Sequence, residues 1–318
     1  MKQHILLTIS IAASLLSACR GGDNTRDEAQ AVVINRLDLA AIEGDTSAIS
    51  SLEPGASVWA GITIGPDTGA RELAMKASDK PYNDDVVTQW ANTDSLSKAL
   101  GGLYGRFTSL IGEDAPAVTY AVASPFNQSV VTADSLIFIA LNHYLGPEKE
   151  YYAYFPEYQR RNKSTDRIGI DVATALVRAA EPYQPAGQFP TALSRMTYEG
   201  AVVEAIMRIS GKTEQQVLGY DDEEYAWLRA NEQEAWRSML SRDMVFSTAL
   251  EVVEGLVRQA AVTSVLHYES PGAAGRYIGH HIVESYLNTH PDTDLRLLLS
   301  PEFYDSETLL SSAGYEPK

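Results

Sequence analysis

The sequence is poor in cysteine, in basic residues and in long apolar runs. Its 318 residues include one cysteine, Cys19, which cannot form an internal disulfide or build a cysteine-rich zinc site. Lysine and arginine number 25 against 42 aspartate and glutamate, and the resulting net charge of −17 disfavours nucleic acid as a partner. Beyond the first nineteen residues the longest apolar runs, such as residues 136–141, have the length of a core strand, so no transmembrane helix is expected.

The first nineteen residues have the pattern of a bacterial targeting signal. Lys2 precedes the uncharged stretch 5–16, which is too short to span a bilayer of roughly 30 Å as a helix, and small residues follow. This pattern predicts a signal peptide over residues 1–18. Residues 16–19 (LSAC) resemble a lipobox, which implies cleavage before Cys19 and a diacylglyceryl group on its thiol. The alternative is an ordinary signal peptide with a chance cysteine.

A lipid anchor predicts the compartment of the mature protein. Acyl chains such as palmitate hold a protein to a membrane by hydrophobic burial. Residues 19–30 are small and polar and indicate a tether, so we expect one domain over residues 31–318. Arg20, rather than an aspartate, follows the cysteine, and by resemblance to bacterial sorting signals this favours the outer membrane, facing the periplasm. The chain is therefore expected in the bacterial cell envelope, attached through its lipid.

The pattern of the body predicts an α+β fold that is mostly helical. Alternation and composition predict strands over residues 117–123, 130–131 and 134–141, which we expect to form one small three-stranded antiparallel sheet. Residues 51–68 are expected to form a loop. Apolar periodicity and caps predict the main helices over residues 29–42, 95–111, 166–180, 191–209, 221–241, 248–262 and 270–289, the last opened by Ser270 and Pro271.

Two histidines on the last long helix are candidate metal ligands. His280 and Glu284 are four residues apart and share a helix face, a spacing that can chelate a metal. The sequence has neither H-E-x-x-H nor H-x-x-E-H, the helical zinc-protease patterns. The pair supplies at most two ligands, and the alternative is a surface histidine beside an acid.

Further candidates are two acids and a group of aromatic residues. Glu199 precedes Gly200 in a helical pattern. The glutamate is a candidate metal ligand or buried acid. The alternative is that it forms a local hydrogen bond, while the glycine allows another helix to approach closely. Asp171 is a candidate buried acid. Tyr151 and Tyr154 belong to an aromatic-rich segment that lines a groove for a peptide or glycan, or that packs against the end of the sheet. No nucleophile elbow is present.

Several segments together resemble the gliding-motility-associated lipoprotein family GldB. The likeness is strongest from about residue 118 onward, and the order and spacing of the segments agree. The matching segments are RLD (36–38), FNQSVVT (126–132), LNHYLG (141–146), FPEY (155–158), MTYEG (196–200), NE (231–232) with Trp236, SPG (270–272), IG (278–279) with SY (285–286), and SAGYEP (312–317).

This resemblance implies a cell-envelope lipoprotein connected with gliding motility and its associated secretion apparatus. The family also resembles predicted zinc metalloproteases of the gluzincin type, in which one helix carries H-E-x-x-H and a later helix supplies a glutamate. Here the corresponding helix reads IDVATA (170–175), so both histidine positions are empty while Glu199 and Gly200 remain. The resemblance implies a zincin-like scaffold without the metal.

We therefore expect a non-enzymatic accessory component with envelope protein partners, no metal and no small-molecule cofactor. Two alternatives stay open. One is a metallopeptidase-like hydrolase that uses His280, Glu284 and Glu199 in a non-standard site. The other is a lipoprotein that binds a peptide or glycan through its aromatic segment.

Overall fold

A mixed four-stranded sheet lies between two groups of helices. The computed structural model describes residues 30–317, so the predicted signal peptide and Cys19 lie outside the described residues. The strand order is β1-β2-β4-β3. Strands β1, β2 and β4 run parallel to one another, and β3 pairs antiparallel with β4 at the edge. The bounds are Ile34–Arg36 (β1), Val118–Val122 (β2), Val130–Ala133 (β3) and Leu136–Ala140 (β4).

The predicted three-stranded antiparallel sheet is wrong in strand number and in direction. The three expected strands are present, but β4 inserts between β2 and β3, and it pairs parallel with β2. The fourth strand, β1, forms within residues 29–42, which were expected to be helical, and α1 starts only at Leu37. Pairing with β2, about 85 residues later, overrides the local helical pattern: Ile34 is the register partner of Thr119, and the Asn35 side-chain amide donates to the Thr119 carbonyl.

The short helices before the sheet and the long helices after it cover opposite faces. Side chains of a strand alternate between faces, so Tyr120 and Phe138 pack under the first group while Ala121 and Ile137 join the main core. With both faces covered, β4 is apolar throughout. The first group comprises α1 (Leu37–Ile42), α2 (Thr46–Ser51), α3 (Gly55–Thr63) and α4 (Ala70–Ala77).

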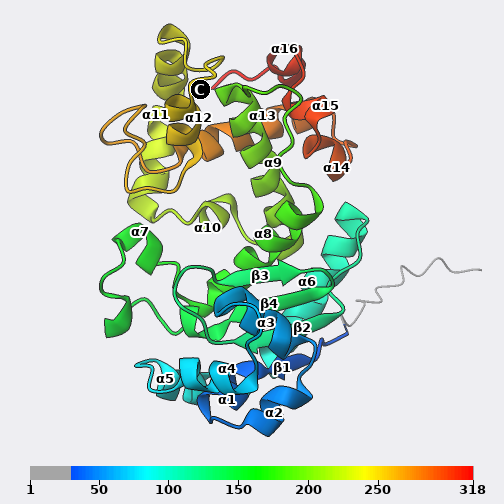
Figure 1. Cartoon of the computed structure of the whole chain (residues 1–318). Coiled ribbons are helices and arrows are strands. Elements are labelled where there is room, and N and C mark those ends of the chain that lie inside the picture. Colours follow the sequence, from blue (N-terminus) through cyan, green and yellow to red (C-terminus); the bar gives the residue numbers. More distant parts are fainter. Residues whose placement is uncertain (1–29, 318) are drawn as a thin grey trace, which may run out of the picture.

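The main core is built largely from the later helices, and Figure 1 shows α11 to α16 gathered at the end of the molecule opposite α1 to α4. Between α4 and β2 come α5 (Asn83–Gln89) and α6 (Asp94–Ile111). After it come α7 (Glu157–Arg160), α8 (Ile168–Ala180), α9 (Ala192–Ser210), α10 (Glu214–Leu218), α11 (Asp222–Ser241), α12 (Leu250–Val257), α13 (Ala274–Thr289), α14 (Leu295–Leu298), α15 (Pro301–Tyr304) and α16 (Leu309–Ala313). Across residues 30–317 no helix combines the length and the apolar character that crossing a membrane requires.

The long helices agree with the sequence patterns, with three corrections. The helix expected over residues 248–262 ends at Val257, because Arg258 takes an extended backbone conformation. The segment 51–68, expected as a loop, contains α3. The helix expected from Ser270 begins at Ala274 instead, because Pro271 forms an isolated bridge with Val262 and its carbonyl accepts a hydrogen bond from Thr263 Oγ1 at 2.6 Å. Local cap signals predicted the start of this helix four residues too early.

Helices α9 and α13 cross in direct backbone contact. A Cβ added to Gly200 would lie 2.1 Å from the carbonyl carbon of Gly279, and a Cβ added to Gly279 would lie 1.9 Å from the carbonyl oxygen of Met196. Real Cβ atoms do not approach other atoms this closely, so both positions require glycine. The crossing fixes which side chains of the two helices meet on either side of it.

Replacing Gly279 by alanine should therefore destabilise the protein. The added methyl group has to push the helices apart, and we expect Gly279→Ala to lower the free energy of unfolding by about 1–3 kcal/mol. Urea denaturation followed by circular dichroism measures this. Gly61→Ala in α3 is the matched control, since no atom lies within 4 Å of its added Cβ, and a helical alanine gains up to about 1 kcal/mol. Equal denaturation midpoints for the two variants would refute the close contact.

Candidate functional site

A cleft of about 740 Å³ lies between the edge strand β3, helix α8 and the helices α9, α12 and α13. Its lining is cationic although the chain as a whole is acidic. Three carboxylates line the cleft, from Asp171, Glu199 and Glu254. Six cationic side chains line it: Lys163, Arg167, Arg178, Arg195, Arg258 and Arg276. We call this feature the arginine cleft.

Glu199 lies at the base of the arginine cleft among three guanidinium groups. Its side chain is 3% exposed. Arg178 Nη2 lies 2.5 Å from Glu199 Oε2, and Arg195 Nη2 lies 3.1 Å from Oε1. Arg276, from α13, brings its Nε to 3.5 Å from Oε2. One carboxylate therefore compensates three positive charges, and the group as a whole stays cationic.

These charges keep Glu199 ionised. Burial alone would raise the pKa of Glu199, but the positive charges of Arg178 and Arg276 outweigh it and lower the pKa. Burial lowers the pKa of Arg276. The Nε of Arg276 has no hydrogen-bond partner among the described residues, since its contact with Glu199 is ionic and lacks hydrogen-bond geometry. A carboxylate held in this way is a counter-ion to the arginines around it.

Asp171 lies on α8 and also lines the cleft. It accepts hydrogen bonds from the Tyr144 hydroxyl at 2.9 Å and from Arg167 Nε at 2.9 Å. Burial and the charge of Asp171 raise the pKa of Tyr144 far above its ordinary range, so this phenol stays protonated and donates. The structure thus brings two predicted acids, Asp171 and Glu199, to one cleft, and each is held by arginine.

The aromatic segment after the sheet divides between core and surface. Tyr151 donates to Asp85 Oδ2 at 2.8 Å and packs edge-on against Tyr82 and Tyr152, whereas Tyr154 is 67% exposed. Of the aromatic residues around it, Phe126 and Phe155 line the arginine cleft and pack at right angles, 5.7 Å apart. The groove-lining aromatic residues are therefore these two phenylalanines, while Tyr151 packs against the core.

His143 lies behind this aromatic wall between two serines. Its Nε2 is 3.1 Å from Ser124 Oγ and its Nδ1 is 2.8 Å from Ser129 Oγ. Burial lowers the pKa of His143 to about 3, and no carboxylate among the described residues bonds its ring. A histidine of such low pKa is a poor general base, because efficient bases titrate near the working pH. No local sequence pattern predicts this serine–histidine contact.

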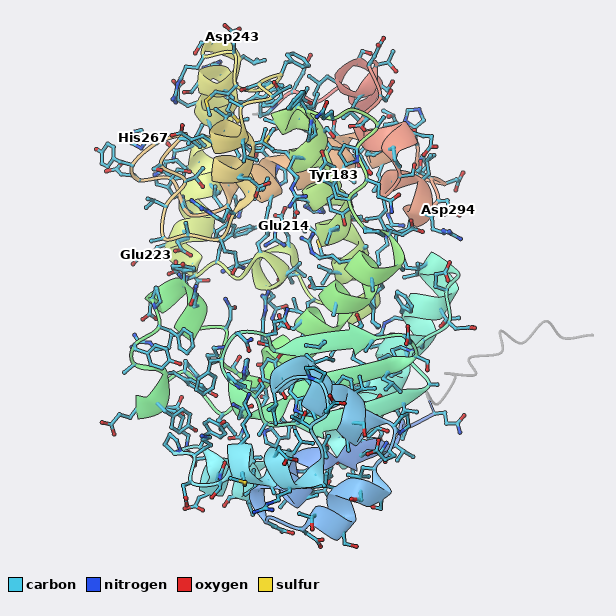
Figure 2. All side chains as sticks on the ribbon, viewed as in Figure 1. Tyr183, Glu214, Glu223, Asp243, His267 and Asp294 are labelled. Atoms are coloured by element: carbon cyan, nitrogen blue, oxygen red, sulfur yellow. The ribbon has the colours of Figure 1, made fainter. Side chains whose placement is uncertain are left out.

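His280 and His281 lie in a second cluster, on the other side of the α9–α13 crossing from the arginine cleft. The expected partner Glu284 is exposed. The alternative of a surface position for His280 is wrong, because this histidine is only 4% exposed. Its ring nitrogens face Glu214 and Glu204 instead. Glu214, labelled in Figure 2, opens α10 near the middle of the view. Burial lowers the pKa of both histidines, but hydrogen bonds to these carboxylates and to Glu232 outweigh it and raise the values to about 9 for His280 and about 10 for His281.

Comparison with known proteins gives one match. The family model described as "Gliding motility protein GldB" matches residues 62–317, that is 256 of the 318 residues. The matched range includes the arginine cleft and the histidine cluster. No curated protein and no solved structure gives a significant match.

Neutralising Glu199 should strongly destabilise the protein. Glu199→Gln keeps the shape but leaves Arg178 and Arg276 without their buried counter-ion, and we expect a loss of about 3–5 kcal/mol in the free energy of unfolding. Glu254→Gln is the matched control, since Glu254 lines the same cleft without an ion pair among the described residues, and its effect should stay within about 0.5 kcal/mol. Urea unfolding of both variants decides; equal stability would show that Glu199 does not compensate the arginines.

The buried His143 predicts a specific pH dependence of stability. Below its ordinary pKa of 6.5 the unfolded chain binds a proton that the folded protein, with a pKa of about 3, does not. Stability therefore falls as the pH drops through this window, by up to about 1.4 kcal/mol per pH unit. His143→Gln removes this effect. When the pH is lowered from 7 to 5, the free energy of unfolding should therefore fall by about 2 kcal/mol less in the variant than in the wild type. His267→Gln, at an exposed position, should follow wild type; parallel curves for wild type and His143→Gln would contradict the prediction.

Proposed function

The chain belongs to the GldB family of gliding motility proteins, and we propose that it acts as a non-enzymatic, lipid-anchored accessory protein of the cell envelope. Family membership implies a role in gliding motility. We further propose that this role includes the associated secretion apparatus, and that the arginine cleft binds an acidic segment of a partner protein. The observation that carries the proposal is the set of three arginines around Glu199.

This set argues against hydrolytic chemistry in the cleft. In the gluzincin-type proteases that the family resembles, the helix corresponding to α8 carries two zinc-binding histidines, and a later glutamate completes the site. Here α8 presents Asp171, Thr174 and Ala175 to the cleft, and Glu199 is bound by guanidinium groups. A zinc ion needs several deprotonated ligands. These residues do not fit one, because the lining formed by the described residues offers no histidine or cysteine and the three guanidinium groups around Glu199 repel a cation. We therefore propose that the protease-like scaffold serves binding.

The same residues favour an acidic, extended ligand. Guanidinium groups bind carboxylates with paired, charge-assisted hydrogen bonds, and Arg258 lines the cleft from an exposed position. The edge strand β3 pairs with β4 alone among the described strands, and Ser129 and Val130 line the cleft next to it. An unpaired strand edge is a template for an added peptide strand. A partner segment rich in aspartate and glutamate would use both features.

The membrane anchor is proposed from the sequence. A lipidated Cys19, beyond the described residues, would hold the domain at the outer membrane facing the periplasm. The net charge of −17 would not attach the domain to anionic headgroups, so the lipid is required for anchoring. Acyl chains hold a protein to a membrane because burying each CH₂ group contributes about 0.8 kcal/mol.

Reversing one charge in the cleft should impair motility. In a gliding host that lacks the gene, wild type should restore colony spreading and secretion, whereas Arg258→Glu should restore little, because it repels an acidic ligand. Arg237→Glu is the matched control: it is the same reversal at an exposed position on α11, outside the cleft lining. Membrane fractions should hold both variants at wild-type amounts.

The same host separates binding from catalysis. Asp171→Asn keeps an oxygen that can accept from Tyr144 but cannot transfer protons as a carboxylate does, and we expect it to complement fully. Normal spreading and secretion in the deletion strain would refute the accessory role. Full complementation by Arg258→Glu would refute the cleft as the binding site, and a folded but inactive Asp171→Asn protein would favour hydrolytic chemistry in the cleft over binding alone.

A further inference from the structure

We propose that Glu214, His280 and His281 form a binding site for one divalent transition-metal ion of the zinc class. The site joins the start of α10 to the middle of α13. It is separate from the arginine cleft and does not depend on the proposed function of that cleft. One carboxylate and two imidazoles form a ligand set that suits zinc and its first-row neighbours better than calcium or magnesium, which prefer oxygen ligands.

The three candidate ligand atoms converge on one point. Glu214 Oε1 lies 2.5 Å from Nδ1 of His280 and 3.4 Å from Nε2 of His281, and one ligand atom from each residue lies within 4.8 Å of the others. Zinc binds nitrogen and carboxylate oxygen at about 2.0–2.2 Å in tetrahedral sites, so its ligand atoms lie about 3.4 Å apart. Small side-chain adjustments would thus bring the three atoms to an ion, with a fourth position left for water.

A second layer of side chains orients each ligand. The other ring nitrogen of His280, Nε2, lies 3.1 Å from Glu204 Oε2, and the other nitrogen of His281, Nδ1, lies 2.8 Å from Glu232 Oε1. Metal-binding histidines almost always give their second nitrogen to a carboxylate or carbonyl, which fixes the tautomer and the ring. Here both histidines have such a carboxylate, on two different helices, α9 and α11.

The supporting residues are themselves held in place. Tyr225 donates to Glu214 Oε2 at 2.8 Å, which leaves Oε1 for the ion. Arg208 lies 2.6 Å from Glu204 Oε1, and Tyr315 donates to Glu232 Oε1 at 2.8 Å. The cluster is buried except at His281, whose side chain is 23% exposed and gives an ion access from solvent. A surface ion-pair cluster has no need of this layered arrangement.

Metal titration of the full-length protein in detergent tests the proposal. After removal of metal with a chelator, Zn²⁺ alone is titrated in competition with a chromophoric chelator, and Co²⁺ is added separately to record visible spectra. We expect one equivalent of tightly bound metal and the intense visible bands of a four-coordinate Co²⁺ site. Less than a tenth of an equivalent of bound metal in the wild type would overturn the proposal and leave the cluster as a network of ion pairs.

Variants locate the bound ion. His281→Gln should lower the affinity by about 100-fold or more, because it removes a ligand. Glu232→Gln keeps all three ligands and should lower it by about 10–100-fold through the orientation of His281. His267→Gln, on the surface, is the control and should bind like wild type. Since His281 is the most exposed of the three ligands, its variant is expected to fold, as circular dichroism will check; unchanged affinity in His281→Gln would overturn the site.

Discussion

The direct contact of α9 with α13 at Gly200 and Gly279 is the constraint on which both candidate sites depend. A helix crossing without side chains between the backbones brings neighbouring residues of the two helices within ion-pair distance. On one side of the crossing Arg276 reaches Glu199, and on the other His280 reaches Glu204. A wider crossing would separate both pairs at once. The two glycines therefore have a role in the electrostatics of the interior as well as in its packing.

The buried charges on the two sides of the crossing are balanced in opposite ways. Around Glu199 the cations outnumber the carboxylate, and the excess faces a cleft open to solvent. Around His280 and His281 three carboxylates, from Glu204, Glu214 and Glu232, surround two imidazoles. Isolated buried charges are costly, and removing one member of a compensated group strands the others. Each cluster therefore tolerates loss of a member poorly, and an anionic ligand would compensate the cationic excess around Glu199.

Sequence patterns predicted the parts of this architecture that local signals determine. Helices α9 and α11 lie where apolar periodicity predicted them, with Thr191 and Asp221 as their caps, and alternation located β2, β3 and β4. Strand pairing was not predictable, because the residues of β1 pair with residues 85 positions later in β2 (119 − 34). The partners of the predicted site residues were not predictable for the same reason. Glu199 was singled out by its local E-G context, but its partner Arg276 is 77 residues away (276 − 199). His280 bonds Glu214 across 66 residues, while its helical neighbour Glu284 is exposed. Spacing along one helix predicts a shared face, but it does not predict which face is buried.

The net negative charge of the whole chain limits which anionic ligands the cationic cleft can attract. With a net charge of −17, the domain repels an anionic ligand at long range, while salt at physiological strength screens charges beyond about 8 Å. Attraction by Arg178, Arg258 and Arg276 is thus felt only once a ligand has entered the cleft. Diffusing anions gain little from steering, whereas a segment already held nearby by its own attachment to the envelope reaches the cleft at high effective concentration. The lipid anchor proposed for this chain would therefore suit a partner at the same membrane.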